Sequence, residues 1–283
     1  MGTELKDGAS NAGRYRIEVE CTKKQDAKLA FRANLAVKMT GPKTALITGA
    51  NGGIGCALAR KLHSAGTKLV LAGRNEIALN SLASELGAKA LIGNFTQADQ
   101  VALCVTKALE ELGEIEAVAH CIGSILLKPA HLTSMTDWQS VMDTNLNSAF
   151  YLLHNLGRPM SKSGGSIAFV SSVAAEKGLS NHEAIASAKA GLAGLTRSAA
   201  ATYARSQLRV NCVAPGLTDT PLAAPITSNE SARKFSEAMH PLGRVGTPEE
   251  IASALYFLLS PDNSWITGQS LSVDGGLSSL QTK

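Results

Sequence analysis

Short runs of apolar residues alternate along the chain with longer stretches in which apolar positions recur at helical spacing. Seven of the short runs have the length and composition of buried strands. They occupy residues 44–48, 67–73, 88–93, 115–120, 165–172, 208–214 and 270–276. Strands that alternate with helices in this way favour a parallel sheet covered by helices on both faces. The pattern therefore predicts an α/β fold with one doubly wound, mostly parallel, seven-stranded sheet.

The alternation starts near residue 41, and this divides the chain into two parts. Residues 1–40 are an N-terminal extension of unknown role. Within it, residues 14–20 have the pattern of a strand and residues 27–37 that of a short amphipathic helix. The extension carries five acidic residues, which argues against a targeting peptide. Residues 41–283 contain the complete α/β pattern and are expected to form one domain.

Composition and charge exclude several kinds of function. The net charge is +4, of which the first 38 residues contribute +3 (eight Lys or Arg less five Asp or Glu), so a basic nucleic-acid surface on the main domain is not expected. No window has the run of about 18 apolar residues that a membrane span needs. The five cysteines are scattered without a CxxC pair, which favours free thiols in a reducing compartment, the cytoplasm. The six histidines show no metal-ligand spacing.

The first strand runs directly into the glycine-rich sequence TGANGGIG, and a helical pattern follows it. Glycines at such a junction allow a tight turn and bring backbone N–H groups close to a pyrophosphate at the helix N-terminus. A tight turn alone could also use them, but the strand–loop–helix context favours dinucleotide binding in a Rossmann-type domain. The expected cofactor contacts in this loop are Thr48, Gly49, Asn51, Gly53, Ile54 and Gly55.

The second strand ends in Gly73-Arg74, with no carboxylate at the position that faces the adenosine ribose in a dinucleotide fold. An acidic residue there would bind a 2′-hydroxyl, whereas an arginine accommodates a 2′-phosphate. We therefore expect Arg74 to favour NADP(H) over NAD(H).

Several motifs, taken in order, resemble the short-chain dehydrogenase/reductase family over roughly residues 42–278. They are TGANGGIG, LAGRN, MDTNL, FVSS, RVNCVAPGLTDTPL, GRVGTPEEIASALYFLLS and ITGQSLSVDGG. Within the family the chain most resembles reductases that act on 3-oxoacyl thioesters and related carbonyls. The substrate itself does not follow from the resemblance, because one fold hosts many functions.

The resemblance implies roles for individual residues. Asn145 matches the asparagine that helps to order a proton-relay water, and Ser172 matches the serine that bonds the substrate carbonyl. Lys189 matches the lysine that holds the nicotinamide ribose and lowers the pKa of a catalytic tyrosine. Further cofactor contacts are implied for Asn94, Gly123, Pro215, Gly216, Thr218 and Thr220. Two of these lie in departures from the family pattern: Asn94 replaces an aspartate, and Gly123 is the one residue of NNAG that is kept in HCIG.

The largest departure is Ile185, which stands at the tyrosine position of the family's YxxxK motif. Isoleucine cannot donate a proton, and a positioned general acid typically contributes about 10²–10⁴ in rate. The substitute that we expect is His182, seven residues before Lys189. Seven positions at about 100° amount to nearly two turns, so both would share a helix face. Enoyl reductases of the broad family place their tyrosine at this spacing; a solvent-exposed histidine is the alternative.

Two T/S-x-x-E patterns predict capped helix starts, one at Ser180, which would put His182 in the first turn, and one at Thr247. Between the motifs, residues 217–246 mix prolines with isolated apolar residues, and in the family this region covers the substrate. We name it the lid segment. Its apolar content favours a hydrophobic or acyl small molecule as substrate.

Three functions remain open on the sequence. The first is an NADP(H)-dependent oxidoreductase that transfers hydride between nicotinamide and a carbonyl or alcohol, with an atypical proton donor. The alternatives are an enoyl reductase and a catalytically weak, cofactor-binding sensor or partner subunit. The helices after MDTNL and around Lys189 are more apolar than one covered face requires, and family members commonly pair these helices. A homotetramer is therefore expected.

Overall fold

The computed structural model describes residues 39–281, which belong to one compact unit that begins at Met39. The strand and helix expected within the first 38 residues lie outside the described residues. In the part that is described, no helix has both the length and the apolar character needed to cross a membrane.

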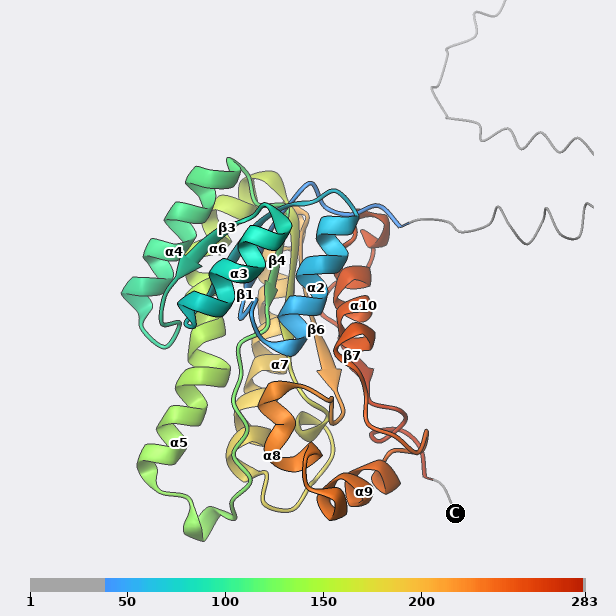
Figure 1. Cartoon of the computed structure of the whole chain (residues 1–283). Helices are drawn as coiled ribbons and strands as arrows, with labels where there is room; N and C mark the ends of the chain where they lie inside the picture. The colour runs from blue at the N-terminus through green and yellow to red at the C-terminus, as the bar shows by residue number, and fades with distance from the viewer. Residues whose placement is uncertain (1–38, 282–283) are drawn as a thin grey trace, which may run out of the picture. The chain divides into compact units, whose positions relative to one another are not determined.

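Seven parallel strands form a single sheet in the order β3-β2-β1-β4-β5-β6-β7 (Figure 1). The strands are β1 Thr44–Thr48, β2 Lys68–Gly73, β3 Lys89–Ile92, β4 Ala117–His120, β5 Gly165–Val170, β6 Leu208–Pro215 and β7 Ser270–Val273. Each coincides with one of the seven apolar runs, so the predicted α/β fold is confirmed. Every neighbouring pair is parallel, and the sheet is thus entirely rather than mostly parallel.

Helices cover both faces of the sheet. The α-helices that pack on the sheet are α2 Gly53–Ser64, α3 Glu76–Leu86, α4 Ala98–Leu112, α6 Ser148–Ser163, α7 Glu183–Tyr203 and α10 Pro248–Leu259. The remaining α-helices are α5 Met135–Met142, α8 Ala224–Thr227 and α9 Glu230–Met239. The shorter turns are η1 Ala130–Leu132, the π-helix η2 Asp143–Asn147, η3 Val173–Ala175, η4 Ala204–Ser206, η5 Pro221–Ala223 and η6 Pro261–Asn263.

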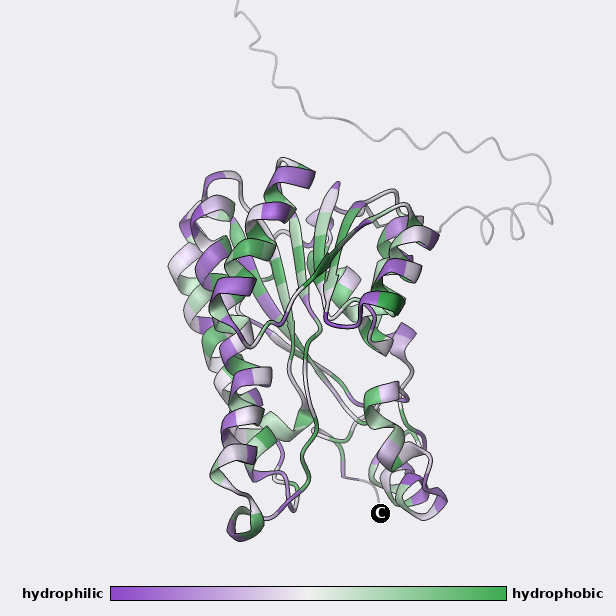
Figure 2. Ribbon diagram, turned by 60° about the vertical axis from the view of Figure 1, so that its left-hand side comes forward, coloured by the Kyte–Doolittle hydropathy of each residue, from purple (hydrophilic) through white to green (hydrophobic). Residues whose placement is uncertain are grey.

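Two buried clusters form the core, one on each face. The first unites apolar side chains of α4, α6 and α7 with Leu46 of β1, and the second unites those of α2, α3 and α10 with Ala45 and Ile47 of the same strand. Successive residues of a strand point to opposite faces, so a single strand supplies both clusters. Figure 2 shows the apolar strands between helices whose outer surfaces are largely hydrophilic.

The strand order also fixes where a ligand could bind. The chain moves outward from β1 to β3 and then returns to β4 on the opposite side of β1. In open α/β sheets, ligands bind at such a switch point, beyond the carboxyl ends of the strands. The segments that follow β1 and β4 therefore meet at the same place.

The two expected helix caps had different outcomes. At Thr247 the capping box is present: its hydroxyl accepts from Glu250 N (3.3 Å), and the Glu250 carboxylate accepts from Thr247 N (2.9 Å). The cap expected at Ser180 is wrong, because α7 begins at Glu183 with His182 as its N-cap residue. Asn181 has a left-handed backbone (φ 63°), and its carbonyl oxygen accepts from Lys128 N (2.8 Å). That tertiary bond sets a turn from which Ser180 does not cap the helix.

Candidate functional site

The glycine-rich turn after β1 is packed too tightly for side chains. Gly49 has φ +72°, and a β-carbon there would lie 2.8 Å from the carbonyl carbon of Cys121, next to β4. A β-carbon on Gly55 would collide with the carbonyl oxygen of Gly49. Helix α2 starts at Gly53 without a side-chain cap from the described residues and without an acidic residue in its first turn. Its free N–H groups and helix dipole suit an anionic group such as a pyrophosphate.

The end of β2 brings Arg74 and Asn51 to the edge of this turn. Gly73 is the last residue of the strand, and a β-carbon there would be 2.5 Å from Asn51 Oδ1, so only glycine leaves room for the amide. Arg74 follows and is exposed to solvent. A guanidinium in this place can bind a phosphate without first breaking a buried ion pair.

Asn94, which follows β3, is held by a local turn. Its Oδ1 accepts from the backbone N–H of Thr96 (3.2 Å) and from the Thr96 hydroxyl (3.0 Å). Its own N–H donates to Gln100 Oε1 (2.7 Å). With both lone pairs of the amide oxygen used, the Nδ2 group is the part that Asn94 can offer to a ligand.

Beyond β4, three of the expected site residues come together. A β-carbon on Gly123 would lie 3.2 Å from Asn145 Oδ1 and 3.5 Å from Lys189 Nζ. Asn145 is completely buried in the π-helix η2, where its Oδ1 accepts from Ser124 N (3.0 Å) and its Nδ2 donates to Ser124 Oγ (2.8 Å) and to Val141 O (2.9 Å). Residues 145 and 189 are thus brought to one point by η2 and α7, with a glycine between them.

Lys189 is a buried cation. Its side chain is only 5% exposed, and its ammonium donates to the carbonyl oxygen of Val170 at the end of β5 (2.7 Å). Burial lowers the pKa of Lys189 from its ordinary value of 10.5 to about 8, against the opposing influence of the Cys121 and Cys212 thiols. A lysine in this state can give up its proton near neutral pH more readily than an exposed one.

The residue that we expect at the family's tyrosine position does not face an open site. Ile185 is 5% exposed and belongs to an apolar cluster with Val141, Ala184 and Ala188. Ser172 follows β5 and is half-buried, and its hydroxyl accepts from Ala174 N (3.2 Å) as the cap of η3. A hydroxyl that accepts one bond still has its proton to donate to a ligand oxygen.

The tyrosines of the described residues are engaged elsewhere. Tyr256 donates its hydroxyl to Met39 O (2.8 Å), and the Tyr203 hydroxyl lies directly against Gly157. Tyr151 packs against the core on the α4–α6–α7 face. These contacts do not place any of the three hydroxyl groups beside Lys189.

His182 occupies the turn before α7 and is half-buried. Its Nδ1 lies 2.7 Å from Ser180 O, and because a carbonyl oxygen only accepts, Nδ1 carries the proton of the neutral ring. Nε2 is then the acceptor that remains. Neutral His182 can take a proton through Nε2, and it can donate one there only after it has been protonated.

The segment after β6 closes over the glycine-rich turn. Pro215 is the last residue of β6 and Gly216 follows it. The Thr218 hydroxyl donates to Gly216 O (3.1 Å). A β-carbon on Gly53 would lie 2.8 Å from the methyl group of Thr220, so this segment touches the start of α2. The Thr220 hydroxyl accepts from the N–H of residue 223 (3.3 Å) and caps η5.

The lid segment contains η5, α8 and α9, which lie beyond the carboxyl ends of β6 and β7 (Figure 1). Leu222 is 50% exposed and Phe235 is 68% exposed, while Ile226 and Met239 are partly buried. The expected mixture of polar and isolated apolar positions is therefore present on the surface of the lid segment.

His120 is a buried polar residue whose contacts the sequence did not reveal. Its Nδ1 lies 2.7 Å from Thr48 Oγ1 and its Nε2 lies 3.0 Å from Ser148 Oγ. Since Ser148 donates to Thr144 O (2.7 Å), it accepts from Nε2–H, and Nδ1 accepts from Thr48. Burial, reinforced by the charge of Lys189, lowers the pKa of His120 to about 3. The neutral ring thus ties the end of β1 to η2 and α6.

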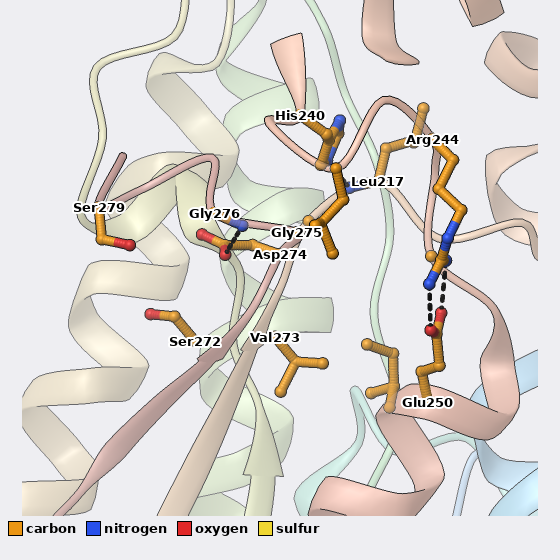
Figure 3. Close-up of a pocket in the computed structure, with 14 residues that line it drawn as sticks. Leu217, His240, Arg244, Glu250, Ser272, Val273, Asp274, Gly275, Gly276 and Ser279 are labelled. Carbon is orange, nitrogen blue, oxygen red and sulfur yellow. Dashed lines mark hydrogen bonds and ion pairs between the residues drawn. The ribbon is translucent and has the colours of Figure 1, made fainter. Parts of the chain in front are cut away.

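A cavity of about 380 Å³ is lined on one side by Gly216 and Leu217, which follow β6 (Figure 3). Its wall includes Leu217 and His240 from the lid segment, Asp274 after β7, and the ion pair between Arg244 and Glu250. His240 was not expected at the site from its place in the sequence. Among the described residues, no group of three His, Cys, Asp or Glu side chains could hold a metal ion.

The strand order and the glycine-rich turn after β1 define a Rossmann-like α/β protein. The chain belongs to the short-chain dehydrogenase/reductase family. A family model described as Enoyl-(Acyl carrier protein) reductase matches residues 49–278, and the family expected from the motifs is thereby confirmed.

Several relatives align with this chain over nearly the whole of their own length. The 3-oxoacyl-(acyl-carrier-protein) reductase FabG of Chlamydia muridarum is 37% identical over 247 residues, which span 83% of this chain and 97% of that protein. The cis-4-hydroxycyclohexanecarboxylate dehydrogenase of Sinomonas cyclohexanicum is 37% identical over 246 residues (84% and 97%). These relatives are named as oxidoreductases.

Solved structures agree with this assignment. A short-chain type dehydrogenase/reductase from Mycobacterium ulcerans superposes with a TM-score of 0.81 at 31% identity, covering 85% of this chain and 91% of that one. An actinorhodin polyketide ketoreductase variant, solved with NADPH, has a TM-score of 0.80 at 26% identity (84% and 98%).

Proposed function

We propose that the protein is an NADP(H)-dependent oxidoreductase that transfers hydride between nicotinamide and a carbonyl or alcohol substrate, with an atypical proton donor. The observation that carries the proposal is the meeting of Gly123, Asn145 and Lys189 beside the glycine-rich turn. A buried lysine and a buried asparagine at the switch point of a parallel sheet are polar groups that the fold alone does not require.

The residues present fit a phosphorylated dinucleotide. The uncapped start of α2 suits its pyrophosphate, Asn94 offers Nδ2 to the adenine, and Arg74 suits a 2′-phosphate. Lys189 would hold the nicotinamide ribose, and the segment from Pro215 to Thr220 would hold the carboxamide face. When bound, the cofactor supplies or accepts the hydride. The ketoreductase solved with NADPH supports the choice of the 2′-phosphorylated form.

In reduction of a carbonyl, the protein must supply a proton to the oxygen while the carbon receives hydride. Ser172 donates a hydrogen bond to that oxygen, and Asn145 orders water that leads from the Lys189 ammonium. His182 takes over part of the proton transfer, with Nε2 as the reacting atom. Because the neutral ring has no proton at Nε2, alcohol oxidation suits His182 better than ketone reduction does.

The substrate class that we infer is a hydrophobic or acyl small molecule. Exposed apolar side chains on the lid segment, Leu222 and Phe235 among them, favour apolar contacts. The names of the relatives point in the same direction, since one is a 3-oxoacyl reductase and another a cyclohexanecarboxylate dehydrogenase.

The same proposal includes a homotetramer in a reducing compartment, the cytoplasm. Much of the apolar surface of α6 and α7 is buried within the monomer. Packing inside the monomer therefore accounts for part of the apolar pattern that suggested helix pairing. Two observations still favour pairing: Phe150 on α6 is 50% exposed, and nothing lies within 4 Å of a β-carbon placed on Gly194 of α7. The four cysteines of the described residues are free thiols.

Two alternatives each have two supporting observations. The matching family model is described as an enoyl reductase, and His182 has the corresponding spacing from Lys189. A weakly catalytic cofactor-binding protein is favoured by the burial of Ile185 and by the absence, among the described residues, of a tyrosine near the lysine.

One set of measurements separates these functions. Calorimetric titration should give the wild type about ten- to a hundredfold tighter binding of NADPH than of NADH. Arg74→Ala should remove that preference, while the exposed Arg158→Ala on α6 should keep it. Equal affinity of the wild type for both nucleotides contradicts the proposal. NADPH oxidation is then followed with a 3-oxoacyl thioester, a cyclic ketone and an enoyl thioester, and turnover of the enoyl thioester alone supports the first alternative.

A further inference from the structure

His240 joins the end of α9 to Leu217, the first residue of the lid segment. The residue directly follows α9 and is only 2% exposed. Its Nε2 lies 3.2 Å from the backbone nitrogen of Leu217, and its Nδ1 lies 2.6 Å from the carbonyl oxygen of Ser236. Figure 3 shows the imidazole beside Leu217 in the cavity wall.

The two partners determine which ring nitrogen carries the proton. A backbone N–H only donates and a carbonyl oxygen only accepts, so Nδ1–H donates to Ser236 and the lone pair of Nε2 accepts from Leu217. The His240 ring is thus neutral, with Nδ1 as a hydrogen-bond donor and Nε2 as a hydrogen-bond acceptor. Few side chains can accept at one end and donate at the other across this distance.

The bond to Leu217 acts on the residues that would contact nicotinamide. A β-carbon on Gly216 would lie 2.6 Å from His240 Nε2, so the ring packs directly on that glycine. Gly216 N donates to Val273 O of β7 (3.1 Å), and Leu217 O accepts from Gly246 N (2.9 Å). Both backbone groups of Leu217 are therefore bonded to the far end of the lid segment, one through His240 and one through Gly246.

We propose that His240 is a positioning residue that holds Gly216 and Leu217 in the conformation required by the nicotinamide half of the cofactor. This rests on the proposed NADP(H) binding. Without the imidazole acceptor, the N–H of Leu217 loses its hydrogen-bond partner in a part-buried position, and the segment between Pro215 and Thr220 can rotate away from α2. The adenosine half of the cofactor, held at the ends of β1 and β2, is not affected.

Two substitutions separate the two bonds. The amide oxygen of His240→Gln can reach the place of Nε2 and accept from Leu217, whereas the amide of His240→Asn reaches only the place of Nδ1 and serves Ser236. We expect His240→Gln to bind NADPH within about threefold of the wild type and His240→Asn to bind it at least about tenfold more weakly. Both should bind adenosine 2′,5′-bisphosphate as the wild type does, because this ligand lacks the nicotinamide half.

The calorimetric outcomes are decisive in each direction. Equal NADPH affinities of the two variants, or equal weakening of NADPH and of adenosine 2′,5′-bisphosphate in His240→Asn, overturn the positioning role. If His240→Asn does not fold, as judged by its thermal transition, His240→Gln decides alone, and a loss of tenfold or more in its NADPH affinity overturns the role. A wild type that binds neither ligand refutes the proposed function, and the role of His240 with it.

Discussion

The methyl group of Thr220 lies against Gly53, so close that a β-carbon on Gly53 would stand 2.8 Å from it. Gly53 opens α2, and Thr220 belongs to the segment after β6. Two segments on which the proposed cofactor site depends are therefore in direct contact, and each limits the side chain that the other can carry.

This contact predicts a rescue. Gly53→Ala should lower the free energy of unfolding by about 1–3 kcal/mol through overpacking against Thr220. Thr220→Ser removes the methyl group but keeps the hydroxyl that caps η5, so the double variant should recover part of that loss. Gly178→Ala serves as the control, because a β-carbon there meets nothing within 4 Å. Urea unfolding measures the wild type, the two single variants, the double variant and the control, and strictly additive effects would show that the two residues do not interact.

Lys189 should make stability depend on pH in the alkaline range. Its pKa is lowered to about 8 from 10.5 by burial, so between these values the unfolded chain holds a proton that the folded chain has released. Stability therefore rises with pH across this window, and the cost of burying the cation is fully present below pH 8. A shift of this size corresponds to about 3 kcal/mol.

The comparison that isolates this effect is Lys189→Met. The stability of the variant relative to the wild type should be greatest at pH 7 and should shrink by about 3 kcal/mol between pH 8 and pH 10.5. Chemical unfolding at a series of pH values measures it. A difference that stays constant with pH would mean that Lys189 titrates as an exposed lysine does.

His120 predicts a separate effect in the acid range. Its pKa is lowered to about 3 by burial, whereas the unfolded side chain titrates at 6.5. As the pH falls from 6.5 towards 3, the unfolded chain gains a proton that the folded chain does not accept, and the wild type loses stability. His120→Asn removes this titration, so its stability should fall less steeply, by up to about 1.4 kcal/mol per pH unit. Parallel curves for the two proteins in urea unfolding would contradict the assignment.

The expected replacement of the family's tyrosine by Ile185 can be tested by introducing a tyrosine at that position. Ile185→Tyr places a phenol four residues before Lys189, at a cost of about 1–3 kcal/mol in stability because the isoleucine site is closed. The variant should reduce simple ketones faster than the wild type does.

His182→Ala should lower kcat/KM at least about tenfold with NADPH affinity nearly unchanged. An unchanged kcat/KM in His182→Ala would favour the weakly catalytic alternative. Ser187→Ala, on α7, is the control for a substitution by alanine near the start of this helix.

Apolar patterning was sufficient to predict the sheet because its five inner strands, β2, β1, β4, β5 and β6, are buried on both faces. Residues such as Leu46, Val118 and Ile167 have no exposed surface, and each lies in a continuous apolar run. The glycine-rich turn could also be predicted from the sequence, because the close approach of backbone to backbone at Gly49 and Gly55 excludes other residue types. Both signals can be recognised from consecutive residues of the sequence, although the space at Gly49 is limited by Cys121 from a distant segment.

Signals that depend on distant contacts were missed or misread. The pattern from Ser180 to Glu183 has the residues of a capping box, but the bond from Lys128 N to Asn181 O sets a different turn. His120 and His240 look like isolated histidines in the sequence. Their neutral forms and their bonds to Thr48 and to Leu217 follow only from the tertiary arrangement.

The contact between Gly53 and Thr220 also bears on how the protein is synthesised. The first strand and its turn leave the ribosome early, but the opposite wall of the site is encoded in the last quarter of the chain. Until that part has emerged and paired as β6 and β7, the turn can offer a nucleotide only one side of a binding site. If the proposed function holds, tight nucleotide binding requires that the chain has been translated beyond β6, and a chain that ends before Thr220 would not retain the ligand.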